Sequence, residues 1–282
     1  MSGRLHDKVA VIVGAGQQPG PTIGNGRATA IRFAEEGARL VLVDRDAEAL
    51  ADTSRAVAAA RGLTPDTATD TATDTATDTA TIEIVVDITA DTAPDEIIAA
   101  AVAAYGRIDI LHNNVGIGAG DAPPHRLTDE VFDRIIDVNL RALWRTCRAA
   151  IPVMRQQGAG VITNISSIAS VAANHIAAYR MSKAGIDALT KNLAVTNARY
   201  GIRVNAILPG LIDTPLGVDS AARELGIDRD VLAARRAASV PMGHQGTAWD
   251  VANAAVFLAS DEAAFISGVC LPVDGGQSAR VG

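Results

Sequence analysis

A tyrosine and a lysine four residues apart, Tyr179 and Lys183, are the residues of this sequence best suited to acid–base chemistry. In a helix this spacing places both side chains on one face. A phenol titrates at about pH 10, and a neighbouring ammonium group favours the phenolate and lowers that pKa. Two serines, Ser166 and Ser167, precede the pair at the end of an apolar run and could hydrogen-bond a substrate oxygen. The fragment predicts proton transfer at a substrate oxygen, although the pair alone could also be a coincidence on a solvent-exposed face.

A glycine-rich stretch near the N-terminus, "VAVIVGAGQQPGPTIGNGRATA" (9–30), could bind the phosphates of a nucleotide. Its first five residues predict a strand, and a helix is expected from about residue 24. Backbone amides at a helix N-terminus bind phosphate, and glycines allow the ligand to approach closely. The strict motif G-x-G-x-x-G is absent, because Pro19 or Thr29 replaces its third glycine when the motif starts at Gly14 or Gly24. Which glycines form the turn is therefore open at this point.

The elements that would position these residues alternate between short runs rich in Val and Ile and longer, alanine-rich amphipathic segments. Strands are expected at 9–13, 39–44, 82–87, 108–114, 160–167, 202–210 and 269–276. Helices are expected from near residue 24, over 46–61 and 94–105, in one or two segments ending at 157, and over 177–200, and the region after residue 210 is irregular but helix-prone. Strands that are apolar throughout belong to parallel sheets covered on both faces. The sequence predicts an α/β fold over 1–282, a single-domain, Rossmann-like, doubly wound parallel sheet of about seven strands.

Composition narrows the class of protein. The chain has 282 residues, is 48% hydrophobic and 20% charged, and carries a formal net charge of −7. This charge does not favour binding to nucleic acid or to an anionic membrane, because such binding depends on clustered Lys and Arg. Cys147 and Cys270 match no disulfide framework and no metal-ligand spacing, so no metal is expected. With no signal-peptide pattern and no long apolar run, we expect a cytoplasmic protein.

A low-complexity segment interrupts the pattern between the second helix and the third strand. It covers 64–81 and contains four copies of the unit D-T-A-T. Such a Thr-rich unit is too short for a solenoid repeat and too polar to build a core. We interpret it as a solvated, disordered insertion, and an acidic interaction segment is the alternative.

Taken together, these motifs resemble the short-chain dehydrogenase/reductase family over essentially the whole chain. The resemblance rests on the Ser–Tyr–Lys fragment and on "NNVG" (113–116), "NAILPGLIDTPL" (205–216) and "FISGVCLPVDGG" (265–276). It implies that Tyr179 exchanges a proton with the substrate, while Lys183 lowers its pKa and holds the nicotinamide ribose. A serine would bond the substrate oxygen and Asn139 would position a water of the proton relay. Ser167 is preferred to Ser166 because it stands at the expected place after the strand, although Ser166 has the family's usual distance of 13 residues from the tyrosine.

The family's turn, G-x-x-x-G-x-G, changes the interpretation of the glycines. Gly20, Gly24 and Gly26 fit it without a gap, but Gly20 lies seven residues beyond Val13, the last apolar residue of the strand. We therefore assign Gly14 to the turn, Gly24 and Gly26 to the pyrophosphate, and "QQPGPT" to an enlarged loop. The resemblance places the following residues at the cofactor: Gly14, Gly24, Asn25, Gly26, Asp44, Arg45, Asp87, Ile88, Asn114, Gly116, Tyr179, Lys183, Pro209, Gly210, Ile212 and Thr214.

Cofactor preference should depend on the end of the second strand. Asp44 stands where an acidic side chain can accept hydrogen bonds from the adenosine ribose and repel a 2′-phosphate. The adjacent Arg45 could instead meet such a phosphate. We expect the carboxylate to dominate and NAD to be preferred over NADP, with Asp87 and Ile88 beside the adenine by resemblance.

The expected function is hydride transfer between NAD and a secondary alcohol or ketone. The alternatives are an NADP-dependent carbonyl reductase, a different enzyme class on the same scaffold such as an epimerase or lyase, and a non-catalytic NAD-binding module. Substrate choice is assigned to the loops 117–126 and 168–178 and to a lid over 214–243. The resemblance also implies a homotetramer built on the helices within 130–157 and 178–200.

Overall fold

The protein is described by a computed structural model in which residues 3–63, 81–172 and 176–280 are placed. The predicted insertion therefore lies outside the described residues except for Thr81, which begins a strand. Residues 173–175 of the predicted substrate loop also lie outside them.

A seven-stranded parallel sheet forms the centre of the molecule. Its strands are β1 (Val9–Val13), β2 (Arg39–Asp44), β3 (Thr81–Val85), β4 (Ile110–Asn113), β5 (Gly160–Ile165), β6 (Ile202–Pro209) and β9 (Cys270–Val273). They are ordered β3-β2-β1-β4-β5-β6-β9, and every neighbouring pair is parallel. All carboxyl ends thus lie at one edge, and the strand order reverses between β1 and β4. Ligands of such folds bind in the crevice at this reversal.

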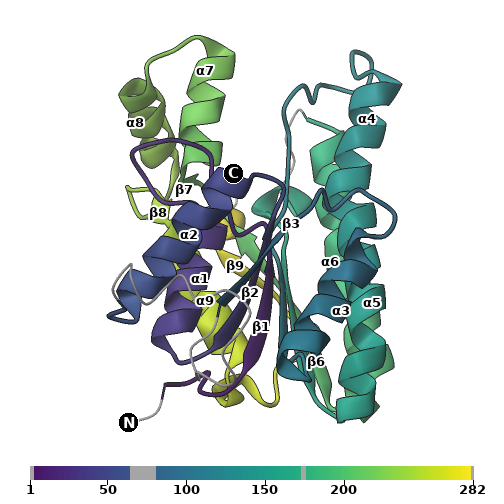
Figure 1. Cartoon of the computed structure of the whole chain (residues 1–282). Coiled ribbons are helices and arrows are strands. Elements are labelled where there is room, and N and C mark those ends of the chain that lie inside the picture. Colours follow the sequence, from purple (N-terminus) through teal and green to yellow (C-terminus); the bar gives the residue numbers. More distant parts are fainter. Residues whose placement is uncertain (1–2, 64–80, 173–175, 281–282) are drawn as a thin grey trace.

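Helices cover both faces of the sheet (Figure 1). One face carries α1 (Asn25–Glu35), α2 (Ala47–Ala60) and α9 (Ala248–Ala259), and the other carries α3 (Ala93–Tyr105), α4 (Asp129–Ile136), α5 (Ala142–Gln157) and α6 (Ala178–Asn197). Two separate apolar clusters result, one on each face: Phe33 and Leu42 belong to the first, and Val41 and Ile186 to the second. Alternate residues of β2 thus face opposite clusters, which explains why the strand is apolar throughout. The predicted fold class is confirmed.

The helices between β4 and β5 agree with the prediction, whereas the region after residue 210 is more regular than expected. The segment expected as one or two helices up to 157 is α4 and α5 joined by a π-helical turn, Asp137–Arg141. The region after residue 210 contains α7 (Ala221–Leu225), α8 (Arg229–Ser239) and the regular helix α9. Two short strands, β7 (Ile212–Asp213) and β8 (Gly246–Thr247), form a parallel pair and lie before and after α7 and α8 in the chain. The helices α7 and α8 stand apart from the two helical layers (Figure 1). In the part of the chain that the structure describes, no helix is long and apolar enough to cross a membrane.

Candidate active site

Tyr179 and Lys183 lie one turn apart near the start of α6, as their spacing predicts. The Lys183 ammonium nitrogen is 5.5 Å from the centre of the Tyr179 ring. The lysine is 2% exposed, and its Nζ donates a hydrogen bond of 2.9 Å to the carbonyl oxygen of Ile165, the last residue of β5. This bond fixes the lysine at the carboxyl edge of the sheet, beside the half-buried Tyr179.

Burial changes the pKa of both groups. Desolvation lowers the pKa of Lys183 to about 8, while the nearby Asp187 raises it. Desolvation also raises the pKa of Tyr179, and a hydrogen bond with the Ser167 side chain lowers it. The net direction for Tyr179 is upward, opposite to the expectation from the lysine alone, because loss of water disfavours the phenolate. The protonated phenol is therefore the favoured form in this structure.

The two candidate serines face different partners. The Ser166 hydroxyl is buried and donates to the carbonyl oxygen of Lys183 at 3.1 Å. The Ser167 side chain lies close enough to the Tyr179 phenol to lower its pKa by hydrogen bonding, and its Oγ accepts from the amide of Ala169 at 3.2 Å. This geometry brings Ser167, rather than Ser166, to the phenol. Its catalytic role stays a prediction.

Asn139 lies in the π-helical turn between α4 and α5 and is fully buried. Its Oδ1 accepts from the amide of Ile117 at 2.8 Å, and its Nδ2 donates to the carbonyl of Ile117 at 2.9 Å and to Ser182 Oγ at 3.0 Å. Ser182 in turn donates to the carbonyl of Tyr179 at 2.7 Å. π-Helical turns occur frequently at functional sites. Here the turn places Asn139 between the loop after β4 and the tyrosine-bearing helix.

The glycine-rich turn has Gly14 at its apex, immediately after β1. Gly14 has φ +87°, a conformation that favours glycine. A side chain on Gly26 would overlap the Gly14 carbonyl oxygen, so α1 reaches the turn only because residue 26 is glycine. Asn114 Nδ2 donates to the same carbonyl at 2.9 Å. Gly20, in contrast, lies away from the strand end and next to Pro215.

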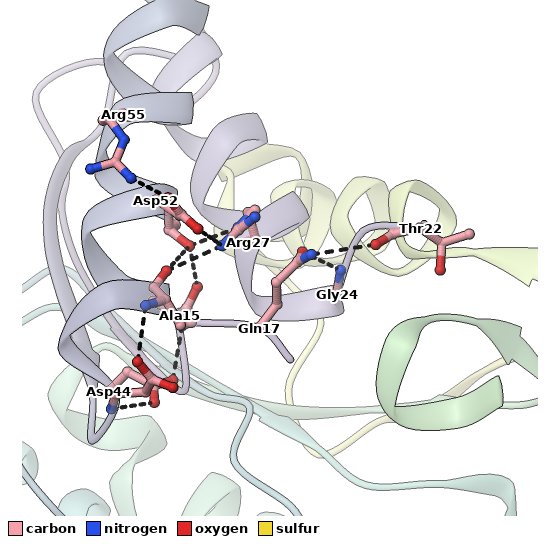
Figure 2. Close-up of polar contacts among 12 residues, drawn as sticks. Ala15, Gln17, Thr22, Gly24, Arg27, Asp44, Asp52 and Arg55 are labelled. Atoms are coloured by element: carbon pink, nitrogen blue, oxygen red, sulfur yellow. Dashed lines mark hydrogen bonds and ion pairs between the residues drawn. The ribbon is translucent and has the colours of Figure 1, made fainter. Parts of the chain in front are cut away.

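The enlarged loop is closed by Gln17, a residue that the sequence analysis did not assign (Figure 2). Its Oε1 accepts from the amide of Gly24 at 2.9 Å, and its Nε2 donates to the carbonyl of Thr22 at 3.4 Å. Gly24 is the N-cap of α1, and within the described residues no side chain caps this helix. Because Gln17 already occupies the Gly24 amide, the amides that the helix start offers to a phosphate are those of Asn25 and Gly26.

Asp44 ends β2 beside this turn (Figure 2). Its Oδ2 accepts from the amide of Gly16 at 2.9 Å, and its Oδ1 accepts from the amides of Arg45 and Asp46 at 2.8 and 3.2 Å. These bonds hold the carboxylate in one orientation at the carboxyl edge, and Arg45 is exposed. Asp87 is also exposed, with its pKa lowered mainly by hydrogen bonds from Thr89.

The remaining predicted cofactor residues lie at the same edge or just beyond it. Gly116 faces Lys183, because a Cβ at this glycine would stand 3.2 Å from the ammonium nitrogen. Ile88 is buried in the apolar cluster of α3 and α5. Pro209 ends β6, and the Gly210 amide donates to the carbonyl of Val273 at 2.9 Å. Ile212 is buried, and Thr214 Oγ1 accepts from the amide of Gly217 at 3.0 Å.

These residues fit a dinucleotide. The N-cap residue of α1, Gly24, has no side chain that could block a phosphate. Gly14 and Gly26 pack closely against each other without side chains between them. Asp44 stands at the end of the next strand, β2. In addition, the buried Asn25 Oδ1 finds no hydrogen-bond partner within residues 3–63, 81–172 and 176–280. Within the same described ranges, no group of three or more His, Cys, Asp or Glu side chains is placed to hold a metal ion.

Sequence reasoning missed Gln17 and Ser182. For Ser182 a signal was present, because it immediately precedes Lys183 and lies three residues after Tyr179, on a neighbouring face of the helix. For Gln17 there was none, since its contact with Gly24 depends on how the loop folds back.

Comparisons with known proteins agree with this geometry. Residues 22–278 match the family described as enoyl-(acyl carrier protein) reductase. The chain is 34% identical over 278 residues to levodione reductase of Leifsonia aquatica, covering 98% of this chain and 96% of that protein. It is 37% identical over 275 residues to 2-(R)-hydroxypropyl-CoM dehydrogenase of Xanthobacter autotrophicus, covering 96% and 99%.

Solved structures are similar as well. Carveol dehydrogenase of Mycobacterium avium, in complex with NAD, superposes with a TM-score of 0.86 at 29% identity, covering 99% of this chain and 100% of that one. The chain belongs to the short-chain dehydrogenase/reductase family, and it is an oxidoreductase of the class that uses a nicotinamide cofactor.

Proposed function

We propose that the protein transfers a hydride between NAD and a secondary alcohol or ketone, with Tyr179 as the general acid and base. The observation that carries this proposal is the cluster of Tyr179, Lys183 and Ser167 at the carboxyl edge of the sheet, next to the glycine-rich turn. The names of the two curated relatives, a levodione reductase and a 2-(R)-hydroxypropyl-CoM dehydrogenase, support this substrate class.

In the direction of oxidation, the alcohol loses its hydroxyl proton and the hydrogen on its carbinol carbon. When bound, the nicotinamide supplies the acceptor for that hydrogen as a hydride. Tyr179 must first lose its own proton, and as the phenolate it takes up the hydroxyl proton of the alcohol, while Ser167 holds the substrate oxygen against it. Lys183, held by Ile165, favours the phenolate electrostatically. Asn139, fixed by Ile117 and Ser182, positions a water that continues the proton relay. Reduction of the ketone is the reverse.

The preference for NAD is argued from Asp44. Its carboxylate is held by three backbone amides, so it cannot turn away from an incoming 2′-phosphate. The Asp44 carboxylate and a 2′-phosphate are both negative and would repel each other. The side chain of the exposed Arg45, in contrast, has no comparable hydrogen bonds among the described residues. NADP-dependent reduction is the second candidate, and it rests on Arg45.

A spectrophotometric screen of secondary alcohols and ketones with NAD and NADP tests the proposal. We expect turnover with a higher kcat/KM for NAD, and an Asp44→Ala variant should lose much of that preference. A higher kcat/KM for NADP in the unmodified protein would overturn the cofactor assignment. NAD binding without turnover of any compound would favour a non-catalytic binding module.

The assembly and location belong to the same proposal. We propose a homotetramer in the cytoplasm, with the segment 214–243 as the substrate lid. Support for the assembly comes from large apolar side chains exposed on α5, on α6 and near the C-terminus: Trp144 (43%), Val195 (81%) and Phe265 (104%). Each of these side chains would lose contact with water if its surface met another copy of the chain. Light scattering should give four times the chain mass of 29.1 kDa, and a monomer would contradict the assembly.

A further inference from the structure

The carboxylate of Asp121, in the loop that follows β4, caps the start of α6. Asp121 Oδ2 accepts a hydrogen bond from the amide of Tyr179 at 2.7 Å. Its Oδ1 accepts from the amides of Ala177 and Ala178 at 3.2 and 3.1 Å, and from that of Ala122 at 2.8 Å. One side chain therefore binds three successive amides at the beginning of the helix that carries the proposed acid and base.

The local sequence supplies no such cap. Helices commonly begin with Ser, Thr, Asp or Asn, whose side chain accepts from the first free amides. The N-cap of α6 is Ala177, which has no side chain able to do so. Asp121, 56 to 58 positions earlier in the chain than the amides it binds, takes that role.

The same short loop is held at its other end by the proposed relay residue. Both backbone groups of Ile117 are bonded to the side chain of Asn139. Between the two ends, Gly118 lies against the phenol ring, since a Cβ there would be 3.5 Å from Tyr179 Cδ2. Arg134 of α4 donates to the carbonyl of Ala119 at 2.7 Å. Residues 117–121 thus connect Asn139 directly to the backbone of Tyr179.

We propose that Asp121 is a positioning residue for the reaction, which sets the place of the Tyr179 phenol relative to Asn139 by holding the first turn of α6. It acts through the helix backbone and does not touch the reacting atoms. The inference rests on the proposed function, because it assigns a purpose to the position of Tyr179.

The test compares Asp121→Ala and Asp121→Asn with Asp133→Ala, which removes one exposed carboxylate from the neighbouring α4. Hydrogen–deuterium exchange of the segment 177–183 measures the cap without any turnover. Steady-state kinetics with cyclohexanol as the probe alcohol and NAD measure kcat and KM, and a fluorescence titration measures Kd for NAD. Asparagine keeps one acceptor oxygen, so it provides a milder variant if the alanine variant does not fold.

We expect the alanine variant to exchange faster at 177–179 and to lose kcat on the order of 10- to 100-fold, as misplaced catalytic groups do. Its Kd for NAD should stay close to that of the unmodified protein, and the asparagine variant should lie between the two. The Asp133 variant should match the unmodified protein in all three measurements.

Three results would overturn the proposal. Unchanged exchange would show that Asp121 does not cap α6 in solution. Faster exchange with unchanged kcat would show that the cap does not position the phenol. A lower kcat with unchanged exchange would show that Asp121 acts on the substrate directly. If the unmodified protein oxidises no alcohol and reduces no ketone, the proposed function fails and the positioning role with it, while the exchange measurement still decides whether the cap exists.

Discussion

At the scale of single residues, the site combines one buried cation with one half-buried phenol. The Lys183 ammonium nitrogen is 5.5 Å from the centre of the Tyr179 ring, and it is anchored by its hydrogen bond to Ile165, the last residue of β5. Desolvation acts on both groups in the direction of their neutral forms. Burial therefore favours the neutral amine and the neutral phenol over their charged forms.

Substitution of Ser167 and of Ser166 should have different effects. We expect Ser167→Ala to lower kcat on the order of 10²-fold or more, because it removes a hydrogen-bond donor at the developing oxyanion. Ser166→Ala removes the bond to the Lys183 carbonyl, and it should cost about 1 kcal/mol of unfolding free energy with little effect on kcat. Turnover and thermal unfolding of both variants check this. An inactive Ser166 variant beside an active Ser167 variant would contradict the assignment.

At the scale of elements, the extended loop between β1 and α1 contacts two parts of the protein. Gln17 closes it on the start of α1, whereas the exposed Gln18 accepts a bond of 2.5 Å from the hydroxyl of Ser220 in the segment 214–243. Gln17 therefore holds the end of the loop that would bind the cofactor, whereas Gln18 contacts the proposed lid.

This difference can be measured with a matched pair of variants. Gln17→Ala removes the two hydrogen bonds that hold the loop against the start of α1, so the loop must be ordered on binding and Kd for NAD should rise by about tenfold. Gln18→Ala should leave that Kd unchanged, because its contact is with Ser220. Calorimetric titration with NAD distinguishes them. Equal effects of the two substitutions would contradict the division of the loop.

The sequence predicted the elements well where their apolar pattern was strong. The central strands β1, β2, β4, β5 and β6 are apolar because helices cover both of their faces, and this apolar pattern can be recognised without knowing which helices those are. The residues of the site were found where spacing along one helix sufficed, as for Tyr179 and Lys183. Asp121 and Gln17 were not found, because their partners are determined by the folding of loops. Helix α9 was included only in an irregular region, since its alanine-rich sequence has little contrast between its faces.

At the scale of the whole molecule, a buried histidine links stability to pH. His112 in β4 is fully buried, and neither ring nitrogen has a hydrogen-bond partner among the described residues. Its ring packs edge-on against Phe33, with 6.0 Å between the ring centres. Burial lowers its pKa from 6.5 to about 4. The unfolded chain therefore takes up a proton at a higher pH than the folded one.

The contribution of His112 is fully present above about pH 6.5 and is lost as the pH falls towards 4, with a total on the order of 3 kcal/mol. We expect a His112→Leu variant to lose less stability than the unmodified protein over this range. Urea unfolding at a series of pH values, at one protein concentration, measures it. Parallel stability curves for the two proteins would contradict the assignment.

The central claim is that Tyr179 transfers the proton while the surrounding fold binds the cofactor. Tyr179→Phe removes the hydroxyl and keeps the ring next to Lys183, so it tests this claim most directly. In the presence of NAD and an alcohol that the unmodified protein oxidises, we expect kcat to fall on the order of 10²- to 10⁴-fold, with Kd for NAD unchanged. Turnover at the rate of the unmodified protein would contradict the account.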